Sequence, residues 1–259
     1  MTAKKITAKK LINRVVRFTQ ETVAPIECRC LVCGKDVFDE LGFCPECIKD
    51  VVFNNGKTCP RCGVAIDGDE DYCGNCAFDK MYFDRAYSAF SYERAVQQAI
   101  LSMKFNNLGS YARVFAKYLV YLVHKHGISF DLVTFVPMSR NRNSIRRHRY
   151  NQSKLLAQHF CAILNVDDLL VDAIVKIKET PAQESLGRAD RKTNLVGAYK
   201  VNPNAKDAIK GKRVLVIDDV KTTGATLNEC AKVLKGAGAT EVIGITVAAR
   251  TENFNYEIE

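Results

Sequence analysis

Apolar and polar positions along the chain follow two alternating patterns, that of short buried strands and that of amphipathic helices. Short apolar runs with the length of strands occur at residues 87–90, 132–136, 214–217 and 242–249. Apolar residues recur every three or four positions, as on one face of a helix, in residues 95–103, 110–122, 152–163 and 227–234. This order of elements predicts an α/β domain. With 259 residues, the chain is long enough for one such domain and a small extra module.

The strand predicted at residues 214–217 leads into the most informative stretch of the sequence, VLVIDDVKTTGATL. Two carboxylates, Asp218 and Asp219, follow the strand. After them comes a loop of small and hydroxylated residues that opens a helix: Thr222, Thr223, Gly224, Ala225 and Thr226. A helix N-terminus presents unpaired N–H groups and the positive end of a dipole, and threonine hydroxyls add donors, so this loop suits a phosphate. The carboxylates would face the vicinal hydroxyls of a sugar at the carboxyl end of the strand, where α/β folds place ligands.

A structural turn and a Walker A loop both account less well for this stretch. An ordinary strand and turn is the first alternative, but a purely structural turn rarely combines two acids with a loop of threonine and glycine. A Walker A phosphate loop is a different motif, and its GxxxxGK[ST] pattern does not occur in the sequence.

A dense basic stretch follows the strand predicted at 132–136. After Pro137 come Arg140, Arg142, Arg146, Arg147, His148 and Arg149. Arginine grips phosphate oxygens with a two-pronged fork, so a phosphorylated partner is favoured over a solvated basic loop. The formal net charge of +9 agrees, because basic side chains outnumber acidic ones after residue 84. A single lysine, Lys104, is predicted in a turn between two helices, where composition alone indicates exposure.

Nine of the eleven cysteines lie between Cys28 and Cys76. Eight of them form four CxxC pairs: Cys30 and Cys33, Cys44 and Cys47, Cys59 and Cys62, Cys73 and Cys76. Each pair can place two thiolates on one tetrahedral ion, so the four pairs predict two four-cysteine zinc sites. The repeat CxxC, ten residues that begin with glycine, CxxC occurs twice and suggests two successive ribbons, although a cross-braced arrangement of the first pair with the third uses the same residues. A disulfide framework would require an oxidising compartment, for which the sequence carries no signal.

The chemistry of these sites indicates a structural or interaction role. Four thiolates close the coordination shell of zinc, and no histidine lies in the region. Few apolar residues separate Cys47 from Cys59, so the metal is expected to supply much of the folding free energy. Cys28 is interpreted as a spare thiol, while Cys161 and Cys230 lie on apolar helical faces and are predicted to be core residues.

The N-terminal segment, residues 1–27, is basic and is predicted to be a helix that leads into the cysteine-rich region. A contact with a membrane surface or nucleic acid, or a transit peptide, is the alternative. The apolar runs are too short to span a bilayer, and no signal peptide is evident, so the sequence predicts a cytoplasmic location without a transmembrane segment.

The stretch VLVIDDVKTTGATL resembles the signature of the phosphoribosyltransferases, and the whole chain resembles the ComF family of double zinc ribbon and phosphoribosyltransferase-domain proteins. The resemblance rests on CLVCG, CPRCG, FDRAYSAFSY, LSMKF, VPMSRNRNSIRRHRYNQSKLLA, and the spaced Gln183, Leu186, Arg191, Asn194 and Gly197–Tyr199. It implies a type I phosphoribosyltransferase fold, in which helices flank a parallel twisted sheet, with a small four-cysteine zinc-ribbon module before it. The expected boundaries are 1–27 for the basic segment, 28–80 for the double zinc ribbon and 81–259 for the phosphoribosyltransferase-like domain.

The resemblance also implies a ligand, 5-phosphoribosyl 1-diphosphate with Mg²⁺, and a role for each motif. Asp218 and Asp219 would hold the ribose hydroxyls, and the loop from Thr222 to Thr226 would hold the 5′-phosphate. The diphosphate would lie on Ser139, Arg140 and Arg142, with Lys104, Arg149 and Lys221 as further candidates. No residue of the motif is an obvious acid or base, so no catalytic residue is assigned, and positioning and electrostatics would carry any transfer.

Two local features qualify this picture. Where members of the family usually have RGFNQ, this chain has Arg149–Gln152, RYNQ, which lacks the glycine and alters the expected backbone. Residues 178–198 lack sustained periodicity and are interpreted either as a mobile loop that closes over the ligand or as a plain surface loop.

For function, the resemblance implies assistance to the import of single-stranded DNA in natural transformation, alongside an ATP-driven DNA translocase. Three hypotheses follow: a transferase that uses the diphosphate sugar, such as a nucleobase salvage enzyme; a non-catalytic DNA-binding or partner-binding protein that keeps the pocket as a sensor; and the glutamine-dependent enzyme of purine synthesis. The third is disfavoured, because that class uses an N-terminal cysteine nucleophile and residue 2 here is Thr2.

Overall fold

The computed structural model describes residues 29–37, 41–66, 69–105, 109–138, 150–178 and 195–250. Its centre is a four-stranded sheet in which every neighbouring pair is parallel, in the order β1-β6-β5-β2. The strands are β1 Arg85–Ser91, β2 Leu132–Phe135, β5 Arg213–Lys221 and β6 Glu241–Ala249. A separate antiparallel pair consists of β3 Ile174–Lys176 and β4 Tyr199–Val201.

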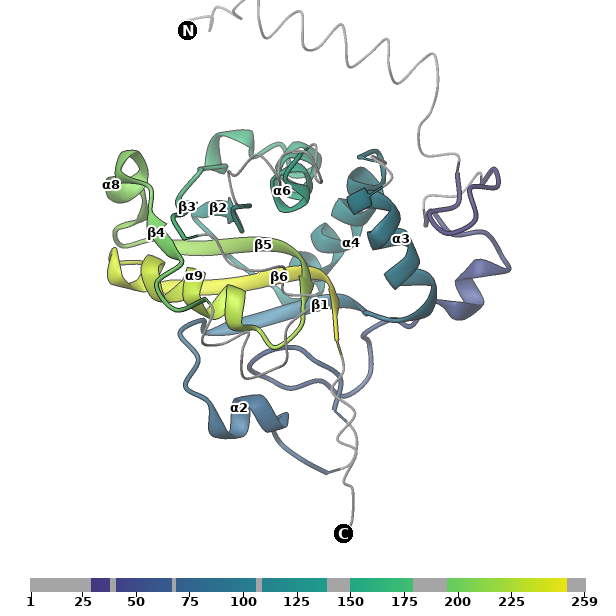
Figure 1. Cartoon of the computed structure of the whole chain (residues 1–259), viewed down its shortest axis with the longest axis horizontal. Coiled ribbons are helices and arrows are strands. Elements are labelled where there is room, and N and C mark those ends of the chain that lie inside the picture. The colour runs from purple at the N-terminus through teal and green to yellow at the C-terminus, as the bar shows by residue number, and fades with distance from the viewer. Residues whose placement is uncertain are drawn as a thin grey trace, which may run out of the picture.

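Helices cover both faces of the sheet (Figure 1). On one face lie α3 Arg94–Phe105, α4 Tyr111–His126 and α6 Gln152–Leu164, and on the other lies α9 Ala225–Gly236 with the β3–β4 pair. The remaining helices and 3-10 turns are short: η1 Cys47–Asp50, α2 Gly74–Phe78, η2 Asp167–Leu169, η4 Pro203–Ala205 and α8 Lys206–Ile209. A parallel sheet buried on both faces requires continuously apolar strands, and Val214 to Ile217 are all buried.

The predicted α/β architecture, with a parallel sheet and flanking helices, is confirmed. Cys161 and Cys230 are fully buried among apolar side chains, as predicted. None of the helices in the described ranges combines the length and apolar character that crossing a bilayer requires.

Two local predictions were wrong. The strand β5 runs on to Lys221, so Asp218 and Asp219 lie within the strand rather than after it. Lys104 lies in the last turn of α3 and not in a turn between helices, because the apolar face of that helix continues through Met103. At the start of α4, the N-cap residue Ser110 makes no capping hydrogen bond with its side chain. By contrast, Asn151 caps α6, and its side chain accepts a hydrogen bond from the Lys154 N–H.

Candidate functional site

The two adjacent aspartates lie near the end of β5, and successive side chains of a strand point to opposite faces. The Asp218 Oδ1 atom accepts a hydrogen bond of 2.7 Å from the Ser153 hydroxyl and one of 2.9 Å from the Asp219 N–H. Burial, followed by the neighbouring charge of Asp219, raises the pKa of Asp218 to about 7, against the opposing hydrogen bond from Ser153. Ser153, at the start of α6, is a site residue that the sequence argument missed.

Asp219 is engaged from the other side by α3. The Lys104 Nζ atom lies 3.0 Å from Asp219 Oδ2, and the Val220 N–H donates a hydrogen bond of 2.6 Å to Asp219 Oδ1. Burial works to lower the pKa of Lys104, but the interaction with Asp219 outweighs it and raises the pKa above its usual range. The structure therefore places one of the candidate residues, Lys104, in direct contact with the aspartate pair.

The loop after β5 and the start of α9 form a small pocket beside Asp218. Its lining comprises Asp218, Val220, Lys221, Thr222, Gly224, Thr226, Leu227 and Thr246. Gly224 precedes α9 in the left-handed conformation, with φ of 78°, which favours glycine. The Thr223 hydroxyl accepts a hydrogen bond from the Ala225 N–H. Acid, hydroxyls and a helix N-terminus thus converge, as the sequence predicted for a sugar phosphate.

The β3–β4 pair brings a tyrosine into contact with Thr226, one of the residues that line this pocket. Tyr199, on β4, is buried and its hydroxyl is hydrogen-bonded to Thr226. Burial raises the pKa of Tyr199, and the Lys176 ammonium lies 5.8 Å from the centre of its ring. Tyr199 closes the sequence GAY, so the motif was visible in the sequence but its place beside Thr226 was not.

Several predicted ligand residues lie outside the described part of the chain. These are Ser139, Arg140, Arg142 and Arg149, together with most of the 178–198 segment. The chain enters the first of these gaps after β2 and leaves it at Tyr150, whose hydroxyl donates a hydrogen bond of 2.6 Å to the Met103 carbonyl. The Asn151 side chain donates one of 3.0 Å to the Val136 carbonyl. The contacts of Tyr150 and Asn151 therefore hold the start of α6 against α3 and β2.

The eight paired cysteines form two clusters of four: Cys30, Cys33, Cys44 and Cys47 in the first ribbon, and Cys59, Cys62, Cys73 and Cys76 in the second ribbon. In each cluster the sulfur atoms lie within 4.8 Å of one another. The Cys33 and Cys44 sulfurs are 3.7 Å apart and the Cys62 and Cys73 sulfurs 3.5 Å apart. Two thiolates on one tetrahedral zinc lie about 3.8 Å apart, so both donor sets fit zinc. The successive pairing is confirmed, and the cross-braced alternative is wrong.

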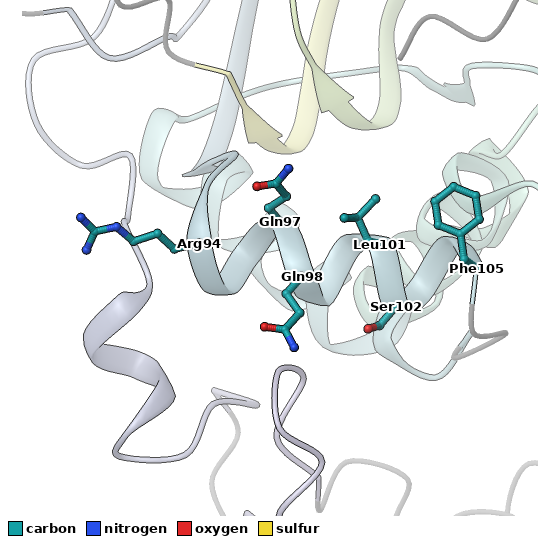
Figure 2. Close-up of a pocket in the computed structure, with 6 residues that line it drawn as sticks. All are labelled: Arg94, Gln97, Gln98, Leu101, Ser102 and Phe105. Carbon is teal, nitrogen blue, oxygen red and sulfur yellow. The ribbon is translucent and has the colours of Figure 1, made fainter. Parts of the chain in front are cut away.

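A second, open groove follows the outer side of α3. It has a volume of about 460 Å³, and its lining residues are Arg94, Gln97, Gln98, Leu101, Ser102 and Phe105. Figure 2 shows their side chains projecting from one helix, with Gln97 and Leu101 directed toward the ends of the sheet strands. The Phe105 side chain, which follows Lys104 in sequence, is 49% exposed. The groove therefore adjoins the turn of α3 that contacts the aspartate pair.

Comparison with known proteins agrees with this arrangement. The model of the double zinc ribbon domain matches residues 22–77, and that of the phosphoribosyl transferase domain matches residues 153–253. The chain is 29% identical over 220 residues to Competence protein F of Haemophilus influenzae, and the alignment covers 83% of this chain and 93% of that protein. It is 27% identical over 207 residues to DNA utilization protein YhgH of Escherichia coli K12, covering 78% and 87%. It is 27% identical over 230 residues to Competence protein ComFC of Streptococcus pneumoniae, covering 83% and 96%. The chain therefore has a double zinc ribbon domain followed by a phosphoribosyl transferase domain, and in this order and in its relatives it is ComF-like.

Proposed function

We propose that the chain binds 5-phosphoribosyl 1-diphosphate with Mg²⁺ at the end of β5, and that it serves DNA uptake in the cytoplasm. One observation carries the ligand proposal: Asp218 lines the same pocket as Thr222, Gly224 and Thr226, at the N-terminus of α9. A carboxylate suits sugar hydroxyls, and a helix N-terminus with threonine hydroxyls suits a phosphate. The uptake role takes its support from the names of the relatives, two of which are competence proteins.

Each side chain has a distinct task in this proposal. Asp218 and Asp219 accept hydrogen bonds from the ribose hydroxyls, and the loop from Thr222 to Thr226 donates N–H and hydroxyl groups to the 5′-phosphate. Ser139, Arg140 and Arg142 hold the diphosphate, with Arg149 as a further candidate, and Mg²⁺ supplies charge neutralisation there when bound. Lys104 orients the Asp219 carboxylate, since its Nζ atom lies 3.0 Å from Asp219 Oδ2.

Transfer to an acceptor would add one chemical step. The bond between ribose C1 and a diphosphate oxygen breaks, the diphosphate leaves with the electron pair, and a lone pair of the acceptor forms the new bond to C1. Since the motif offers no evident acid or base, the protein would contribute orientation and electrostatic stabilisation of the leaving diphosphate. Ligand binding is therefore the first property to test.

Isothermal titration calorimetry with 5-phosphoribosyl 1-diphosphate and Mg²⁺ tests the proposal. We expect saturable heat with the native chain and its loss in Asp218→Ala. The matched control is Asp207→Ala, which removes an exposed carboxylate on α8 and leaves binding unchanged. Absence of heat with the native chain would reject the ligand.

A second candidate function, binding of single-stranded DNA alongside an ATP-driven translocase, is favoured by the α3 groove. Phe105 offers a half-exposed ring on which a base can stack, and the Gln97 and Gln98 amides offer donors and acceptors. Fluorescence anisotropy with a labelled oligonucleotide should give an affinity that falls steeply with salt, falls again in Phe105→Ala and survives Asp218→Ala. Loss of DNA binding in Asp218→Ala would mean that the DNA needs the sugar-phosphate pocket instead.

A further inference from the structure

The second ribbon is built into the edge of the sheet next to the phosphate loop. The Ala86 N–H, on β1, donates a hydrogen bond of 2.8 Å to the Arg61 carbonyl, which lies inside the CPRCG turn. Gly63 ends that turn in the left-handed conformation, and a Cβ there would overlap the Ala86 carbonyl. The turn that supplies Cys59 and Cys62 is thereby fixed against the backbone of β1.

The segment that follows the second ribbon reaches the first turn of α9. The Tyr82 N–H donates a hydrogen bond of 2.6 Å to the Asn228 side-chain carbonyl, and the Asn228 N–H donates one of 2.8 Å to the Gly224 carbonyl. The buried Phe83 ring lies 3.8 Å from where a Cβ on Gly224 would be. Tyr82 and Phe83 therefore contact the residues that shape the phosphate loop.

Packing also joins the second ribbon to the phosphate loop. The four thiols of the second ribbon, Phe83 and Leu227 belong to one buried apolar cluster. Leu227 lies in the first turn of α9, directly after the phosphate loop. The ribbon and the loop therefore share one packed core.

We propose that the second ribbon, through its zinc centre, positions the loop from Thr222 to Thr226, and that Tyr82 and Phe83 transmit this order to the first turn of α9. The part that concerns affinity rests on the proposed function, whereas the part that concerns the order of the loop does not. The first ribbon contacts α4 and β1 instead, so its zinc serves as an internal reference.

Two cysteine variants test the inference by metal analysis and hydrogen exchange of residues 221–228 in the ligand-free chain. We expect Cys62→Ser and Cys33→Ser each to hold one zinc ion instead of two. Exchange in residues 221–228 should accelerate about tenfold in Cys62→Ser and stay at the native rate in Cys33→Ser. Equal exchange in the two variants would overturn the inference.

Asn228→Ala carries the test even where Cys62→Ser does not fold, because it keeps all eight thiolates and removes the acceptor of the Tyr82 N–H. Exchange in residues 221–228 should again accelerate about tenfold, and binding of 5-phosphoribosyl 1-diphosphate should weaken. Asn204→Ala, which removes an exposed amide on η4, is the matched control. Native exchange in Asn228→Ala would overturn the inference. A native chain that fails to bind the diphosphate while Cys62→Ser still loosens the loop would reject the proposed function and leave the inference standing.

Discussion

The two faces of the central sheet each carry one zinc ribbon, yet they surround the two centres differently. On the face of α3, α4 and α6, the first ribbon has an exposed Cys33 and a half-buried Cys47, and its anchor in the core is Phe43. On the face of α9, the four thiols of the second ribbon are 1–9% exposed and belong to the same apolar cluster as Leu227. The first ribbon is therefore a partly exposed zinc centre at the surface, whereas the second ribbon is part of the core beside the proposed ligand site.

Removal of zinc should show the largest difference between the two ribbons, in the rate at which each one releases its ion. An excess of chelator is expected to release zinc in two phases, first from the first ribbon, where Cys33 is accessible, and about tenfold more slowly from the second. Structural zinc contributes on the order of 10 kcal/mol to folding, so the melting temperature should fall after each phase. Chromogenic release kinetics with parallel thermal melts measure this, and a calcium-selective chelator is the control. A single phase that carries both ions would remove the distinction between the ribbons.

Truncation of Phe43 should weaken the first face and leave the ligand site intact. This side chain is fully buried, with its ring 6.1 Å from that of Phe90 in an edge-on arrangement. Phe43→Ala is expected to lower the free energy of unfolding by about 3–5 kcal/mol, measured by urea denaturation. Phe78→Ala is the matched control, since Phe78 is 91% exposed and its loss should change stability by no more than about 0.5 kcal/mol. Equal losses would show that Phe43 is not an anchor.

The ion pair of Lys104 with Asp219 joins α3, on the first face, to β5 at the proposed ligand site. Lys104→Met leaves a buried carboxylate without its cation and should cost about 3 kcal/mol of stability at neutral pH. Adding Asp219→Asn should recover part of that loss, because the unpaired charge is then removed. Urea titrations of both single variants and the double variant measure the coupling. Additive losses would mean that the 3.0 Å contact between Lys104 and Asp219 contributes no coupling energy.

The sequence predicted the larger features because each depended on local pattern. Unbroken apolar runs such as Val214–Ile217 specify a buried parallel strand, and the CxxC spacing specified both four-cysteine donor sets. Four thiolates from adjacent turns need no long-range information to meet, although the choice between successive and cross-braced pairing required the structure.

The contacts that complete the site were not predictable, because they join distant parts of the chain. Lys104 meets Asp219 only because α3 runs two residues further than its apolar pattern suggested. Ser153 and Tyr199 come from α6 and the β3–β4 pair, and no spacing rule connects them to β5. The hydrogen bond from the Tyr82 N–H to Asn228 depends in the same way on how the segment after the second ribbon packs on the sheet.

The raised pKa of Asp218 should make both the stability of the chain and its ligand binding depend on pH. Burial raises the pKa of Asp218 from 3.8 to about 7, so the folded chain holds a proton there that the unfolded chain releases. The associated stabilisation is complete below pH 3.8 and is lost as the pH rises toward 7. The affinity for the ligand should depend on pH in the opposite direction from the stability. If the carboxylate is the form that accepts the ribose hydroxyls, the affinity for 5-phosphoribosyl 1-diphosphate should fall about tenfold per pH unit below 7 and level off above it.

Calorimetry at constant Mg²⁺, from about pH 5.5 to about pH 8.5 in steps of about half a pH unit, measures this profile. The ligand has phosphate groups that titrate in the same range, so the native profile alone does not assign the slope. Asp218→Asn supplies the matched control, since it keeps the shape of the side chain and removes its titration. Where Asp218 is responsible, the variant binds weakly and its remaining pH dependence is that of the ligand phosphates. A native profile with the slope of the variant would assign the titration to the ligand and leave Asp218 ionised throughout this pH range.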